Sequence, residues 1–159
     1  MGLFYKSLGR IPLFLILIPL LFACAYPNGR IYLYDEKGLF QKGWMEIVKE
    51  NPIGKDENIK VTPLFKNENG SQFIIQIRDR EKPHIHETHD LTVVVKRGKG
   101  VLHLGKDELL IKCDDIVFIP RGVFHYFVNT GSEPAVAYVI FNPIYDGNDI
   151  KFITTEDEH

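Results

Sequence analysis

The 159-residue chain has few cysteines and almost no net charge, and both shortages restrict its class. Two cysteines cannot build the framework of disulfides that supports small secreted domains without a large core. A formal net charge of −2 gives no basic surface for nucleic acid, so we expect no nucleic-acid partner. The chain also has no internal repeat and no glycine loop of the phosphate-binding type. These shortages leave room for one globular domain with a short appendage.

The only long apolar run lies near the N-terminus. Ile11–Phe22 follows Lys6 and Arg10 and contains two prolines, which makes it too short and too broken for a comfortable membrane span. The pattern is typical of a signal peptide. The run ends in Leu-Phe-Ala-Cys, which resembles the lipobox of bacterial lipoproteins. This resemblance implies a signal peptide over residues 1–23 and a lipid on Cys24, which would anchor the protein to a membrane of the cell envelope. The alternative is an ordinary signal peptide in which Cys24 has no role.

The rest of the chain changes from a mixed segment to a succession of short strands. Within residues 24–58 we expect a tether, a short strand over Ile31–Tyr34 and an amphipathic helix over Leu39–Lys49 that packs outside the main domain. Residues 59–145 contain short apolar and β-branched runs between Gly, Pro, Asn and Asp turns, which predicts a sandwich or barrel. Residues 146–159 form an acidic tail in this interpretation.

Five of the six histidines lie between Pro83 and Asn129. His84 and His86 are two positions apart in a strand-like segment, so their side chains face the same side. His125 follows a Pro-x-Gly turn far along the chain. Imidazoles that converge from separate strands are what a transition-metal ion requires. We interpret the three as a metal triad; the alternative is three unrelated surface or capping histidines.

These residues resemble the two sequence motifs of the cupin superfamily in their order and spacing. The matching positions are His84, His86, Asp90 and Gly98 in the first motif and Pro120, Gly122, His125 and Asn129 in the second. The resemblance covers about residues 72–143. It implies an all-β fold, the cupin double-stranded β-helix or jelly-roll barrel, here with a short N-terminal helix. It also implies a divalent transition metal (Fe, Zn, Mn, Cu or Ni) on the three histidines.

Two positions depart from the cupin pattern. Asp114 stands where the second motif begins with glycine. The first motif has no glutamate at its ligand position: counting forward from His86 makes Asp90 the fourth ligand, whereas counting back from Gly98 reaches Leu91, which cannot ligate. A regular strand up to Gly98 favours an inward Leu91 and an outward Asp90. His89 and His103 are further candidates for the pocket or for contacts behind the ligands.

The superfamily contains dioxygenases, isomerases and decarboxylases, so the resemblance does not select one reaction. We expect a metal-binding protein of the bacterial cell envelope with oxygenase-type or isomerase-type chemistry on a small molecule. The alternative is a lipoprotein that binds or senses a metal or small ligand without turnover. A homodimer is compatible with either hypothesis.

Overall fold

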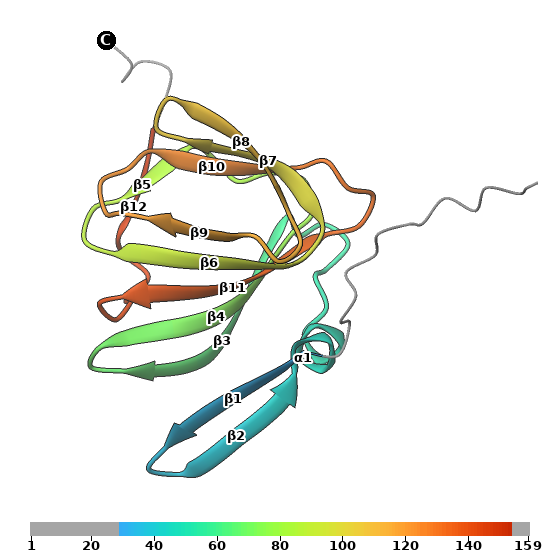
Figure 1. Cartoon of the computed structure of the whole chain (residues 1–159), viewed down its shortest axis with the longest axis vertical. Coiled ribbons are helices and arrows are strands. Elements are labelled where there is room, and N and C mark those ends of the chain that lie inside the picture. Colours follow the sequence, from blue (N-terminus) through green and yellow to red (C-terminus); the bar gives the residue numbers. More distant parts are fainter. Residues whose placement is uncertain (1–28, 154–159) are drawn as a thin grey trace, which may run out of the picture.

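The computed structural model describes residues 29–153, which contain twelve strands and one helix (Figure 1). The elements are β1 (Arg30–Asp35), β2 (Gly38–Gly43), α1 (Trp44–Glu50), β3 (Ile59–Asn67), β4 (Gly70–Ile77), β5 (His84–His86), β6 (Asp90–Arg97), β7 (Lys99–Leu104), β8 (Asp107–Lys112), β9 (Ile116–Ile119), β10 (His125–Asn129), β11 (Ala135–Asn142) and β12 (Ile150–Phe152).

Ten of these strands form two antiparallel sheets that face each other. One sheet has the order β3-β4-β11-β6-β9 and the other has the order β12-β5-β10-β7-β8. Strands that are distant in sequence lie side by side in both sheets, as Figure 1 shows for β4 and β11. This is the arrangement of a double-stranded β-helix, so the predicted all-β jelly-roll barrel with one short helix is confirmed.

Alternation along the strands separates an inner face from an outer face. In β4, Phe73, Ile75 and Ile77 line the space between the sheets, whereas Ile74 and Gln76 point to the other side and are almost fully buried there. The outer side chains are buried because α1 covers them. Trp44 and Ile47 pack against Ile74 in a cluster separate from the barrel interior.

The helix packs on the outside of the barrel, as predicted, but it is shorter than the predicted Leu39–Lys49. Residues Gly38–Gly43 form a strand that pairs with β1, and Phe40 lies opposite Leu33. Gly38 has a φ of 104°, so the chain turns back at this residue and forms a hairpin instead of a longer helix. The apolar spacing of this stretch fits a helix, but pairing with β1 decides the outcome.

The segment interpreted as an acidic tail contains a strand. Ile150 pairs with His86 and Phe152 pairs with His84, so β12 lies at the edge of the sheet beside β5. The predicted signal peptide and Cys24 lie outside the described residues. Within residues 29–153, no helix is long and apolar enough to cross a membrane.

Candidate metal centre

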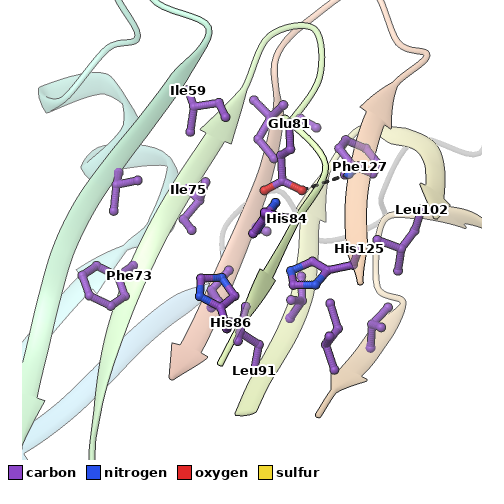
Figure 2. A pocket seen from close by; sticks show the side chains of 18 of the residues that line it. Ile59, Phe73, Ile75, Glu81, His84, His86, Leu91, Leu102, His125 and Phe127 are labelled. Carbon is purple, nitrogen blue, oxygen red and sulfur yellow. Dashed lines mark hydrogen bonds between the residues drawn. The ribbon is translucent and has the colours of Figure 1, made fainter. Parts of the chain in front are cut away.

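Three buried histidines meet inside the barrel. His84 and His86 come from β5 and His125 comes from the adjacent β10, where it lies directly opposite His84. One ring nitrogen from each lies within 4.8 Å of the others, and each residue is at most 6% exposed. Figure 2 shows the side chains of His84, His86 and His125 close to one another at one side of the cavity. The structure therefore brings together the three histidines that the sequence pattern singles out.

The backbone orients two of the three imidazoles. His84 Nδ1 lies 2.7 Å from the Lys82 carbonyl oxygen, and His125 Nδ1 lies 2.9 Å from the Val123 carbonyl oxygen. A carbonyl only accepts, so each Nδ1 carries a hydrogen and Nε2 is the ring nitrogen left to face a metal. Such partners fix the tautomer and ring orientation of metal-ligating histidines. A donor set of three imidazoles fits Zn, Cu, Fe or Ni.

The pKa values of His86 and His125 favour this neutral form. Burial, followed by the neighbouring His84 and His125, lowers the pKa of His86 from 6.5 to about 4. Burial also lowers the pKa of His125 to about 4. Both groups are therefore unprotonated near neutral pH, as metal ligands must be.

A backbone hydrogen bond connects the Pro-x-Gly turn of the second motif to the first motif. Gly122 donates its N–H to the His86 carbonyl at 2.7 Å and has a φ of 76°, which glycine adopts without strain. Asp114, at the other glycine position of this motif, has a φ of 73°. Aspartate is among the few residues that adopt this left-handed conformation, so the substitution keeps the backbone path that glycine would give.

His86 has a different partner from the other two histidines. Its Nδ1 lies 3.5 Å from Asp149 Oδ2, and neither a carbonyl nor a closer group hydrogen-bonds to it. Asp149 precedes β12 and is only 9% exposed. Its Oδ1 accepts hydrogen bonds from the Thr88 N–H at 2.9 Å and the Thr88 hydroxyl at 2.7 Å. The carboxylate is thus held in place behind His86 by the loop that follows β5.

His89 belongs to this buried cluster and not to the triad. Its Nδ1 contacts Asp149 Oδ2, and its Nε2 lies 2.9 Å from the Ile144 carbonyl oxygen. With both ring nitrogens engaged, His89 has none left for a metal. Its contacts join the β5–β6 loop to the segment between β11 and β12.

Asp90 and Leu91 lie on opposite faces of β6. Asp90 accepts hydrogen bonds from the Arg121 N–H at 2.9 Å and from the Arg121 side chain at 2.8 and 3.1 Å. The Arg121 hydrogen bonds lower the pKa of Asp90 to about 2. Leu91 is buried and lines the cavity beside the histidines. The structure therefore places an apolar side chain, and no carboxylate, at the fourth ligand position of the motif.

His103 lies outside the cavity. Its ring stacks on Tyr126 with centroids 4.1 Å apart, and its Nδ1 is 3.3 Å from Glu108 Oε1. Asn129 serves the turn before β11, where its amide donates to the carbonyls of Arg78 and Glu133. Neither residue contacts the triad.

The triad opens into a cavity of about 420 Å³ between the two sheets. Most of its wall is aliphatic or aromatic, including Phe73, Ile75 and Phe127. The polar residues of the wall in the described part of the chain are Asn58, Arg80, Glu81, Lys82, His84, His86, His125 and Tyr145. The volume is that of a site for a small molecule.

Sequence reasoning missed two acidic residues of this region, Glu81 and Asp149. Glu81 lies three positions before His84, and its carboxylate faces the cavity (Figure 2). Burial raises the pKa of Glu81, whereas His84 and the Phe127 N–H act in the opposite direction. For Asp149 the available signal was the Ile-Lys-Phe alternation of residues 150–152, which is that of a short strand.

Comparison with known proteins supports the architecture. The model of the cupin domain family matches residues 72–141. An uncharacterized protein of Aquifex aeolicus is 45% identical over 104 residues, which is 65% of this chain and 84% of that protein. A glucose-6-phosphate isomerase of Pyrococcus abyssi is 30% identical over 139 residues, covering 74% of this chain and 70% of that enzyme. A Klebsiella pneumoniae protein with a double-stranded β-helix domain superposes with a TM-score of 0.57 at 19% identity, over 68% of this chain and 95% of that one.

Proposed function

The chain belongs to the cupin superfamily, and on that premise we propose that it binds one divalent transition-metal ion on His84, His86 and His125. The observation that carries this proposal is the triad itself, with ligand nitrogens within 4.8 Å and two imidazoles oriented by carbonyls. A bound ion in such a site supplies Lewis-acid or redox chemistry to a molecule beside it. Three protein ligands leave coordination positions open for that molecule.

We further propose that the cavity beside the triad takes a small, mainly apolar molecule, on which the protein performs oxygenase-type or isomerase-type chemistry. The walls of the cavity are mainly aliphatic and aromatic, and His84, His86 and His125 lie at one side of it. A relative is an isomerase of a phosphorylated sugar, but this cavity has few polar groups to bind such a substrate. We therefore do not transfer the sugar substrate of that relative to this chain.

A second function, ligand binding or sensing without turnover, is favoured by one observation. Leu91 occupies the position at which the motif places its carboxylate ligand. A site without that carboxylate has one protein ligand fewer on the metal than the motif supplies. Turnover by the metal-loaded protein separates the two functions once a ligand is known.

The metal content of the purified protein tests the triad. We expect one ion per chain in the wild type and loss of that ion in His84→Ala, His86→Ala and His125→Ala. His103→Ala is the matched control, because it removes an imidazole that stacks on Tyr126 outside the cavity and should leave the metal content unchanged. Full occupancy in both His86→Ala and His125→Ala would refute the triad.

We also propose that the protein is anchored to a membrane of the cell envelope through lipid on Cys24. The support is the sequence alone: basic residues, an apolar run and Leu-Phe-Ala-Cys at the end of that run. In cells fed a palmitate analogue, the wild type should be labelled and should fractionate with membranes, whereas Cys24→Ser should be unlabelled. A labelled Cys24→Ser protein would contradict the proposal.

A further inference from the structure

Glu81 is the one acidic side chain on the cavity wall within residues 29–153. Its position is fixed by β10, the strand that carries His125. The Glu81 N–H donates to the Phe127 carbonyl at 2.9 Å, and Glu81 Oε2 accepts from the Phe127 N–H at 2.9 Å. Arg80 forms a bridge with Val128 immediately beside these bonds. The carboxylate is therefore held rigidly next to the triad.

The fold does not require the negative charge of Glu81. Within the described part of the chain, no lysine or arginine forms an ion pair with it, although Lys82 and Arg80 flank it in sequence. Its one hydrogen bond, from the Phe127 N–H, could equally be accepted by the neutral amide of glutamine. A charge in an apolar cavity is unfavourable to folding unless it is paired. A carboxyl group placed there without an ion pair to lysine or arginine is a candidate functional group.

Glu81 is also not a metal ligand in this arrangement. The set of side chains whose donor atoms lie within 4.8 Å of one another contains the three histidines and not Glu81. Figure 2 shows the carboxylate beside His84, with one oxygen bonded to Phe127 N and the other directed to the Ile59 and Ile75 side of the cavity. A molecule between that oxygen and the triad would contact both.

We propose that Glu81 is a specificity-determining residue that accepts a hydrogen bond from the cavity ligand. The ligand class is then a small, mainly apolar molecule with two polar features: an oxygen that binds the metal and a hydroxyl or amine that donates to Glu81. A divalent ion on the triad favours the ionised carboxylate, which only accepts hydrogen bonds. This inference rests on the proposed function, because it places the other end of the ligand at the metal.

The test compares two series of probes on the cobalt-loaded protein. One series contains straight-chain monocarboxylates, and the other contains the same acids with a terminal hydroxyl, from glycolate to 6-hydroxyhexanoate. Binding is followed by the change in the visible spectrum of the cobalt ion. At one chain length, the hydroxyl should tighten binding to the wild type about tenfold, as a hydrogen bond to a charged group does. Glu81→Gln should lose most of this gain while binding cobalt as tightly as the wild type.

Two further measurements make the result decisive. Glu108→Gln, which alters an exposed carboxylate on β8, is the matched control and should keep the full gain. The thermal midpoint of metal-free Glu81→Gln should equal or exceed that of the wild type, because the variant removes a buried charge and keeps the bond to Phe127.

Four outcomes would overturn the inference. They are an unchanged hydroxyl preference in Glu81→Gln, a lowered thermal midpoint in that variant, a lack of binding by both probe series, and a wild type that binds no cobalt. The first three leave cobalt binding by the triad intact, so they refute the role of Glu81 and not the proposed metal site. The fourth refutes the proposed function together with this inference.

Discussion

Asp149→Asn should weaken metal binding without touching a ligand. The Asp149 carboxylate lies 3.5 Å from His86 Nδ1, on the opposite side of the ring from Nε2. Removing such a partner of a metal-bound histidine typically weakens affinity about 10–100-fold. The carboxylate is shared with Thr88 and His89, and its contact with His86 is long, so we expect the lower end, about tenfold. Asn retains the shape and one acceptor oxygen, which limits the structural disturbance.

Competition between the protein and a chromophoric zinc chelator measures this change. The control is Asp90→Asn, which also alters a carboxylate that joins two segments, here through Arg121 outside the cavity. We expect that control to change zinc affinity less than about threefold, since surface ion pairs contribute little. Equal affinity in Asp149→Asn and the wild type would show that His86 is oriented without Asp149. An equal loss in Asp149→Asn and Asp90→Asn would show a general effect of loop disorder instead.

Three other perturbations test separate parts of the structure. Leu91→Glu should tighten zinc binding by adding a fourth ligand, and Asp90→Ala should change zinc binding little. If Asp90→Ala instead loses the metal and Leu91→Glu gains no affinity, the assignment of the two faces of β6 is reversed. The metal-free protein should lose stability as pH falls from about 6.5 toward 4, because the unfolded chain protonates His86 and His125 at their ordinary pKa of 6.5 while folding holds both at about 4. Urea midpoints across this range check the sign, and a flat profile would contradict it. Trp44→Ala should reduce the free energy of unfolding by about 3–5 kcal/mol, because the ring is buried. Zinc affinity should stay unchanged, because the ring packs outside the barrel. Weaker zinc binding by the folded variant would show that the outer cluster influences the metal site.

The barrel and its histidine cluster were predictable because both depend on local patterns. Alternation in β4 and β6 indicates strands with one face toward the interior, and the spacing from Pro120 to His125 indicates a turn that delivers an imidazole. Even the departure at Asp114 follows local chemistry, since aspartate tolerates the φ of 73° that the position requires.

The contacts behind the triad were not predictable, because they join distant parts of the chain. Asp149 lies 60 positions after His89, and no spacing rule relates the two. Glu81 becomes notable only when its backbone pairs with Phe127 and directs its side chain into the cavity. Likewise, Leu39 and Phe40 fit the helical spacing of the apolar residues that follow them, and only pairing with β1 places them in a strand. Sequence patterns identify elements and motifs, whereas these features depend on which elements become neighbours.

The position of β5 between β10 and β12 also sets the order in which the site can be completed during synthesis. His84 and His86 emerge from the ribosome well before His125, and the strand that covers their other edge, Ile150–Phe152, emerges later still. Pairing between such distant segments is slow to form and has to wait until both are available. A nascent chain that ends before Asp149 lacks both the strand that covers one edge of β5 and the carboxylate behind His86, so the proposed metal site would be complete only after synthesis of nearly all the described residues.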